Sequence, residues 1–241
     1  MVSENLFQTW NTEKLNKKVL KLQKKMLKKN PYLKYNFFND IDMNNSVEQN
    51  FDLNIIRNFT KIKHIVAKSD FWRYLMLYKF GGIYLDIDSL IIGKLDQNLI
   101  EKNSGIITFE PNNKYFLQWS LIYDKNHPVL EKCIENIIHN MDKQLYKHDI
   151  HSLTGPKLYT KSVIEILKEN SIEFEDLINF ETNNQFMKID LGKYLLKLIP
   201  SGNYDKYFLF KHKYTHLLSN TQKGSSNPQH WTETQKYINV Y

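Results

Sequence analysis

Cysteine, glycine and proline are scarce in this chain of 241 residues, which holds one cysteine, eight glycines and six prolines. The single cysteine, Cys133, excludes an intramolecular disulfide framework, and no Cys and His spacing typical of a structural zinc site is found. Few glycines and prolines leave little room for long flexible linkers. With 41% hydrophobic residues the chain can bury one sizeable core, so we expect a single domain over residues 1–241.

Long apolar runs are also lacking, because no segment approaches the roughly 18–20 apolar residues that span a bilayer. The first ten residues, MVSENLFQTW, do not show the basic and then apolar pattern of a signal peptide. We therefore expect a soluble chain in the cytoplasm or at the cytosolic periphery of a membrane.

Positive charge is abundant: the formal net charge is +7, and much of it lies in the segment Lys14–Lys29. Leu15, Val19, Leu22 and Met26 recur there at helical spacing, which predicts a helix with one apolar face and one lysine face. One interpretation is a solvated outer helix packed on a sheet. Another is a basic helix that contacts an anionic membrane peripherally. Nucleic acid is not an expected partner, because the lysines lack interleaved aromatic residues.

Apolar runs alternate with helical patterns along most of the chain. Strands are expected near residues 6–10, 35–38, 83–87, 105–109, 186–189 and 207–210. Helices are expected near residues 14–29, 46–59, 69–80, 128–141 and 156–168, the last two beginning at prolines. This alternation predicts an α/β fold with a mostly parallel sheet, which binds ligands beyond the carboxyl ends of its strands.

The most informative segment is Ser69–Leu90, which reads SDFWRYLMLYKFGGIYLDIDSL. Ser69 is predicted to cap a helix, with Asp70 in its first turn, where the helix dipole favours a carboxylate. Arg73 lies three residues further, on the same helix face. The pair Gly81-Gly82 is expected to end the helix and lead directly into a strand.

Strand alternation sorts the residues that follow into two faces. We expect Ile83, Leu85 and Ile87 in the core. The opposite face would then carry Tyr84, Asp86 and Asp88. Two carboxylates at the end of a buried strand need a positive partner, and a hard divalent cation such as Mg²⁺ or Mn²⁺ prefers such oxygen ligands.

Other interpretations of these residues remain open. Asp86 and Asp88 would also suit a solvated strand end, since Asp-x-Asp is common, and Arg73 with Asp70 would suit a surface ion pair. A metal-dependent phosphodiesterase or nuclease also uses paired carboxylates, although it usually needs further acidic or His ligands. A sugar-binding protein without catalytic turnover is a third hypothesis.

The segment Ser69–Leu90 closely resembles the DXD-containing sugar-binding region of a glycosyltransferase superfamily. That superfamily includes yeast-type initiating mannosyltransferases, inositol-phosphoceramide mannosyltransferases, capsular polysaccharide transferases and the catalytic domains of clostridial glucosylating toxins. Weaker similarities lie at Gln8-Thr9-Trp10, His127-Pro128, Thr154-Gly155-Pro156 and Tyr214-Thr215-His216. The resemblance implies a GT-A, Rossmann-like fold, a UDP- or GDP-sugar donor, Mn²⁺ or Mg²⁺, and transfer with retention to a glycan, lipid or protein. It divides the chain into a donor half, residues 1–142, and an acceptor half, residues 143–241.

The resemblance also implies roles for single residues. Asp70 and Arg73 would hold the transferred sugar, and Asp86 would contact the ribose or sugar and help to bind the metal. Asp88 would ligate the metal directly, and Tyr84 would line the donor pocket.

Three further positions complete the implied site. Trp10 would stack on the nucleotide base, although a core tryptophan is an equally good interpretation. His216 would supply a late metal contact, although the spacing around it departs from the family's pattern. The family's asparagine upstream of His-Pro is absent, and Gln118 or Trp119 stands nearest to its place.

Overall fold

The structure is a computed structural model that describes residues 2–111, 113–209, 235–236 and 239–241. Its strands are β1 (Asn5–Thr9), β2 (Lys34–Phe38), β3 (Gly82–Leu85), β4 (Leu90–Ile91), β5 (Gly105–Ile107), β6 (Ser120–Tyr123), β7 (Met187–Leu191), β8 (Tyr194–Leu198) and β9 (Phe208–Leu209). Its helices are α1 (Lys17–Lys29), α2 (Asp40–Asn50), α3 (Leu53–Lys61), α4 (Ile65–Phe80), α5 (Gln97–Glu101), α6 (Pro128–Asp142), α7 (Ile150–Leu153), α8 (Pro156–Glu169), α9 (Phe174–Thr182) and α10 (Ser201–Tyr204).

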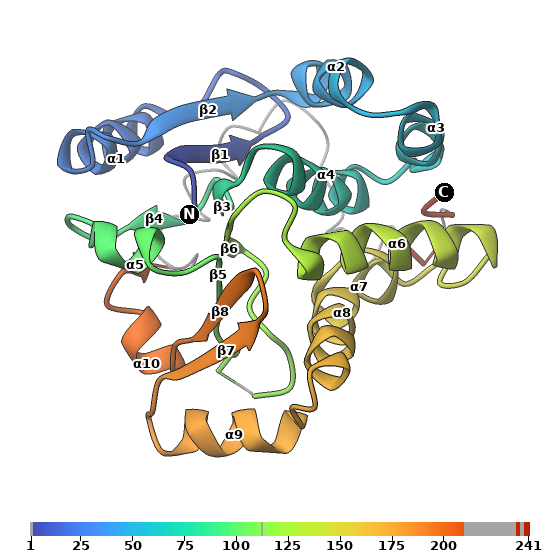
Figure 1. Ribbon diagram of the computed structural model, residues 1–241. Helices are drawn as coiled ribbons and strands as arrows, with labels where there is room; N and C mark the ends of the chain where they lie inside the picture. Colours follow the sequence, from blue (N-terminus) through green and yellow to red (C-terminus); the bar gives the residue numbers. More distant parts are fainter. Residues whose placement is uncertain (1, 112, 210–234, 237–238) are drawn as a thin grey trace.

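A mixed sheet forms the centre of the described chain, with strand order β2-β1-β3-β6-β5-β8-β7 (Figure 1). The strands β1, β2, β3, β5 and β8 run in one direction, and β6 and β7 run against them. A small antiparallel pair, β4 with β9, lies beside it. The predicted α/β class with a mostly parallel sheet is therefore confirmed.

Alternating side chains of the central strands pack into two separate cores. Leu6 and Ile83 lie on one face, in a cluster that includes Met26 of α1. Phe7 and Tyr84 lie on the other face, in the larger cluster built with α4, α6 and α8. This sorting is the period-two pattern expected for a sheet covered on both sides, and Figure 1 shows helices flanking it.

The helix before the acidic segment begins earlier than the sequence suggests. The prediction that Ser69 caps it is wrong, because α4 begins at Ile65 and the His64 side chain accepts a hydrogen bond from the Val66 amide. Asp70 consequently lies beyond the first turn, where the dipole effect has fallen off. Its stabilisation must come from side-chain partners.

The end of that helix agrees with the prediction. Gly81 follows α4 with φ +64°, and its amide donates to the carbonyl of Leu77. Gly82 has φ +123°, and a β-carbon there would collide with the carbonyl oxygen of Asn5. Only glycine therefore permits β3 to follow the helix directly and pair closely with β1.

The helix predicted over residues 46–59 is in fact two helices, α2 and α3. The chain is extended at Phe51, and the Asp52 side chain then accepts from the amides of Asn54 and Ile55 to begin α3. The helices predicted at Pro128 and Pro156 begin at those residues. In the described part of the chain, no helix has the length and apolar character needed to cross a bilayer.

Candidate functional site

A cavity of about 170 Å³ opens where α4 meets the end of β3. Its lining residues are Val66, Asp70, Arg73, Asp86, Glu110, Gln118, Trp119, Ile150, His151, Gly155 and Pro156. Three of the residues singled out from the sequence thus converge on one cavity, although Asp70 and Asp86 are separated by a helix end and a strand.

Arg73 joins the two acidic residues of the cavity. Its Nη2 lies 2.9 Å from Oδ1 of Asp70 and 3.3 Å from Oδ1 of Asp86. Its Nη1 donates to the carbonyl oxygen of Gln118 at 3.1 Å, and the guanidinium lies 4.3 Å from the centre of the Tyr84 ring. This is a buried charge cluster, since Arg73 is 5% exposed and Asp70 is 4% exposed. The interpretation of Arg73 and Asp70 as a surface ion pair is therefore wrong.

The charge state of Arg73 is secured by its neighbours. Burial alone would lower the pKa of Arg73, but Tyr84, Asp86 and Asp70 together raise it above its ordinary value. Arg73 therefore stays positive at any pH at which the protein is folded. The cluster carries a fixed cation between two carboxylates, in a cavity lined with hydrogen-bonding groups.

Asp70 is held from the opposite side by Thr154, which precedes α8. The Thr154 hydroxyl donates to Oδ2 of Asp70 at 3.1 Å, and its carbonyl oxygen accepts from the Tyr74 hydroxyl at 2.9 Å. The Gln118 amide donates to the same carbonyl at 3.1 Å. Both oxygens of Asp70 therefore have a fixed partner, which sets the orientation of its carboxylate toward the cavity.

The acidic pair lies on a turn rather than on a continuous strand. The predicted strand 83–87 is too long, because β3 ends at Leu85 and the Ser89 amide donates to the carbonyl of Asp86 at 2.9 Å. Ile87 packs with Val19 and Trp10 in a cluster separate from that of Leu85. Because residues 86–89 form a turn, the alternation of side chains along a strand does not determine the direction of the Asp88 side chain.

The backbone of Asp86 is anchored on both sides. Its amide donates to the carbonyl of Trp119 at 2.8 Å, and its carbonyl accepts from Nε2 of Gln8 at 3.0 Å. Its Oδ1 also accepts from the Tyr84 hydroxyl at 2.8 Å. These bonds come from β1, β3 and the residue immediately before β6, so the acidic turn is fixed at the centre of the sheet.

The donor chemistry of this turn fits a hard divalent cation. Asp86 and Asp88 supply carboxylate oxygens, which Mg²⁺ and Mn²⁺ prefer, and Asp88 is only 7% exposed. Among the described residues, no group of three or more His, Cys, Asp and Glu side chains is arranged to hold a metal. Two carboxylates leave several positions of an octahedral ion to water or to phosphate oxygens. The third expected ligand, His216, lies outside the described residues.

Trp10 follows β1 and packs against the small cluster of Val19 and Ile87, as Phe37 also does. Its Nε1 is buried and has no hydrogen-bond partner among the described residues. The ring is partly exposed, so the core and base-stacking interpretations both remain compatible with its position beside the acidic turn.

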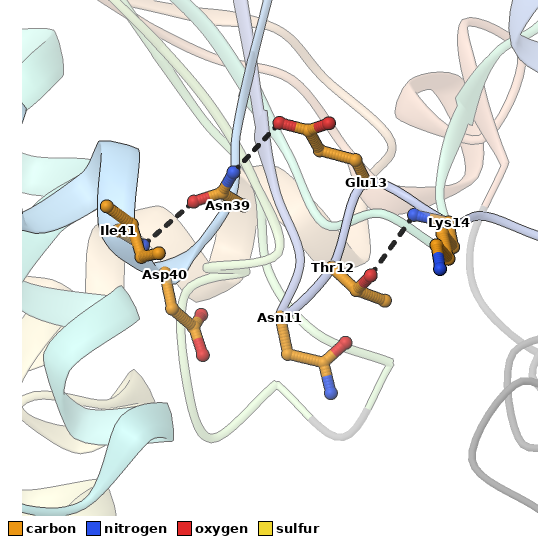
Figure 2. Close-up of a pocket in the computed structure, with 7 residues that line it drawn as sticks. All are labelled: Asn11, Thr12, Glu13, Lys14, Asn39, Asp40 and Ile41. Carbon is orange, nitrogen blue, oxygen red and sulfur yellow. Dashed lines mark hydrogen bonds between the residues drawn. The ribbon is translucent and has the colours of Figure 1, made fainter.

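A second hollow, of about 270 Å³, lies beyond the carboxyl ends of β1 and β2. Figure 2 shows the residues that line it: Asn11, Thr12, Glu13, Lys14, Asn39, Asp40 and Ile41. The Asn39 side chain ties the two loops together, because its Nδ2 donates to Glu13 at 3.0 Å while its Oδ1 accepts from the Ile41 amide. This is the edge of an α/β sheet at which ligands usually bind.

Sequence reasoning missed several residues of the cavity. Glu110 and His151 line it, but neither stands in a pattern that marks it in the sequence. In the sequence, Thr154 stands out only as part of Thr154-Gly155-Pro156, and Gln118 only as the nearest residue to an absent asparagine. Thr154 contacts Asp70 across 84 residues of sequence, and Gln118 contacts Arg73 across 45. A local sequence pattern cannot reveal contacts between such distant residues.

Comparison with known proteins gives a family match over part of the chain. Residues 6–105 match the family described as "Glycosyltransferase sugar-binding region containing DXD motif". This range begins at the second residue of β1 and includes the Asp70–Arg73 pair and the acidic turn, so the resemblance inferred from Ser69–Leu90 is confirmed.

Individual relatives agree with that class. The chain is 26% identical over 203 residues to the initiation-specific alpha-1,6-mannosyltransferase of Candida albicans, covering 68% of this chain and 53% of the relative. It is 26% identical over 183 residues to an uncharacterized glycosyltransferase of Acanthamoeba polyphaga mimivirus, covering 74% and 71%. The chain thus spans about half the length of the yeast relative.

A solved structure supports the fold. The PaToxG glycosyltransferase superposes with a TM-score of 0.59 at 18% identity, covering 76% of this chain and 75% of that chain. The predicted GT-A class is therefore confirmed.

Proposed function

We propose that the protein is a metal-dependent, retaining glycosyltransferase that moves a hexose from a UDP- or GDP-sugar to a hydroxyl group of a glycan, lipid or protein. The observation that carries this proposal is the buried cluster in which Arg73 bridges Asp70 and Asp86 within one cavity. The family match and the mannosyltransferase relative support the same class of reaction.

The cavity suits a sugar ring. Its volume of about 170 Å³ is smaller than the roughly 300–1,000 Å³ of sites for drug-sized ligands, so it would hold one ring rather than a whole donor. Carboxylates with fixed partners, such as Asp70, accept hydrogen bonds from sugar hydroxyls without being reoriented. The nucleotide would extend toward Trp10 and the carboxyl ends of β1 and β2.

A divalent cation, Mn²⁺ or Mg²⁺, would be held by Asp88 with help from Asp86. When bound, it would offset the negative charge of the donor diphosphate. Arg73 adds a fixed positive charge beside the same acidic turn, and it needs no reorganisation because three groups already hold it.

The reaction forms a bond between the acceptor oxygen and the anomeric carbon while the bond from that carbon to the diphosphate oxygen breaks. The bonding electrons leave with the diphosphate, which also takes up the acceptor proton. We favour attack from the face that the diphosphate leaves, which retains the anomeric configuration. The cavity carboxylates Asp70 and Asp86 both interact with Arg73, so neither is assigned as a covalent nucleophile.

The test is incubation of the purified chain with UDP-glucose, UDP-galactose, UDP-N-acetylglucosamine or GDP-mannose, with Mn²⁺ or Mg²⁺, and measurement of released nucleoside diphosphate. We expect release with at least one donor. We also expect loss of at least about 100-fold in Asp88→Ala, the range for removing one stabilising group from a catalytic site. Asp142→Ala is the matched control, because Asp142 is an exposed aspartate at the end of α6.

Three results would contradict the proposal, and the first two are readouts of activity. One is full activity in Asp88→Ala. Another is cleavage of an added nucleic acid with no release from any sugar donor, which would favour a nuclease. The third is binding of donor and Mn²⁺ without turnover over a panel of acceptors, which would instead indicate a catalytically silent sugar-binding protein.

A further inference from the structure

We propose that the outer face of α1, together with the turn after β4, binds the surface of an anionic lipid bilayer. The exposed lysines that form this surface, named here the lysine face, are Lys17, Lys18, Lys21, Lys24, Lys25, Lys28 and Lys29. The opposite side of the helix is buried on the sheet through Val19, Gln23 and Met26. The proposal is independent of the proposed enzymatic function.

The charge of the lysine face is not neutralised locally. The helix α1 contains no acidic residue, and no lysine of this face lies in an ion pair with a carboxylate in the described part of the chain. A lysine elsewhere, such as Lys132, contacts two glutamates at 3.5 and 3.3 Å. A row of unneutralised lysines concentrates positive potential, and a negatively charged surface complements it.

Apolar side chains adjoin the lysine face. Leu20 of α1 is 37% exposed, and Ile92, which follows β4, is 42% exposed. The two segments are fastened together, because Asn30 Nδ2 at the end of α1 donates to the carbonyl of Gly93 at 3.0 Å. Figure 1 shows α1 and β4 on the same side of the sheet. Lys94, also exposed, extends the positive charge past Ile92.

This combination favours a bilayer over a nucleic acid. Lysines attract both, but exposed aliphatic side chains gain from entering the boundary between headgroups and acyl chains. Nucleic-acid surfaces usually add arginine and stacking aromatic residues, and α1 has neither. Each lysine near an anionic leaflet strengthens partition about fivefold, so a face of seven suffices for measurable binding.

The consequence concerns the position of the candidate site. Lys14 lines the hollow of Figure 2, three residues before α1 begins at Lys17. A bilayer against the lysine face would therefore lie beside the edge at which β1 and β2 end. That arrangement would give a membrane-associated acceptor a short path to the site.

The experiment is co-sedimentation of the full chain with phosphatidylcholine vesicles, with and without about 30% phosphatidylserine, at low and near-physiological salt. We expect binding to the anionic vesicles only, weakened by salt. The charge-reversal variant changes Lys21, Lys25 and Lys28 to Glu. The matched control changes the exposed Lys143, Lys168 and Lys188 to Glu.

We expect the first triple variant to lose at least tenfold in vesicle binding and the second to lose less than threefold. Ile92→Ser should weaken binding several-fold without any change of charge, which tests the apolar contribution. Circular dichroism would establish that each variant is folded. Absence of vesicle binding, equal losses in both triple variants, or tighter binding to RNA than to anionic vesicles would each overturn the proposal.

Discussion

The hydroxyl of Tyr84 donates a hydrogen bond to Oδ1 of Asp86 at 2.8 Å, while the Tyr84 ring lies against the guanidinium of Arg73. One side chain thus contacts both charges that define the cavity. Burial raises the pKa of Tyr84 well above its ordinary value, so its hydroxyl remains a donor at every relevant pH.

Tyr84→Phe should keep the ring contact and remove only the hydrogen bond. A bond to a charged acceptor contributes about 1.5–3 kcal/mol, so we expect kcat/KM for the donor to fall at least tenfold. The steady-state rate of nucleoside diphosphate release, measured over a range of donor concentrations, gives this kcat/KM. Tyr204→Phe is the control, because the Tyr204 hydroxyl is also buried but bonds to Ser120. Equal activity losses in both variants would argue against a role specific to Asp86.

Arg73→Met should be strongly destabilising, because it leaves Asp70 and Asp86 without their shared cation. Removing one member of a buried ion pair costs about 3–5 kcal/mol. The free energy of unfolding from urea titration measures this loss. Combining Arg73→Met with Asp70→Asn should restore part of it by removing one uncompensated charge. If the double variant is no more stable than Arg73→Met alone, the uncompensated charge of Asp70 is not the cause of the lost stability.

Thr154→Val should lower activity while leaving the shape of residue 154 almost unchanged. The substitution removes the hydrogen bond to Oδ2 of Asp70, and we expect about a tenfold loss in kcat/KM. Thr154→Ser retains a hydroxyl and should recover most of the activity. A loss of stability in both variants without this difference in activity would indicate a purely structural role.

Acidification should destabilise the protein through His127, which caps α6 and is fully buried. Burial lowers the pKa of His127 from 6.5 to about 3. Between these two values the unfolded chain binds a proton that the folded chain does not, so the free energy of unfolding falls as pH falls. From pH 7 to 5 the expected loss is about 2 kcal/mol from this group.

Urea titrations at several pH values would measure that slope. His127→Asn keeps a side chain that can cap a helix but does not titrate. The free energy of unfolding of this variant should therefore depend less steeply on pH, and the slope should fall by the equivalent of up to one bound proton. His64 and His151 also have lowered pKa values from burial, so part of the acid sensitivity should remain in the variant. An unchanged slope would show that His127 is not buried as a neutral group.

Gly82→Ala should cost more stability than Gly93→Ala. Both glycines have positive φ, but a β-carbon at Gly82 would collide with Asn5, whereas nothing lies within 4 Å of one at Gly93. Both alanine variants should therefore suffer backbone strain, but only Gly82→Ala should also suffer a steric collision. Thermal or urea unfolding of the two variants would measure the difference, and similar losses would contradict a close approach of β1 and β3.

The sequence predicts this fold well where local signals are strong. Pro128 and Pro156 mark the first residues of α6 and α8, and the alternation around Leu6 and Ile83 identifies buried strands. The start of α4 is missed, because Ser69 resembles a cap while His64, a less usual one, is the residue that caps it. The residue that caps a helix depends on the local backbone geometry. The preference of Ser, Thr, Asp and Asn for this position is statistical, so it does not identify the cap of every helix.

The candidate site is predictable in part for a similar reason. Asp70, Arg73 and Asp86 stand in one recognisable segment, and the structure brings them together. Thr154 and Gln118 reach the same cavity from distant parts of the chain, so tertiary contacts alone reveal them. The position of Asp88 depends on a turn that interrupts the strand, which an alternating pattern does not reveal.

Two buried glutamines connect the basic helix to the acidic turn. Nε2 of Gln23 in α1 donates to Oε1 of Gln8 at 3.0 Å, and Nε2 of Gln8 donates to the carbonyl of Asp86. The Tyr35 hydroxyl donates to the same Gln8 oxygen. A displacement of α1 along the sheet would therefore strain the backbone of the acidic turn, so this outer basic helix is coupled to the turn that carries Asp86 and Asp88.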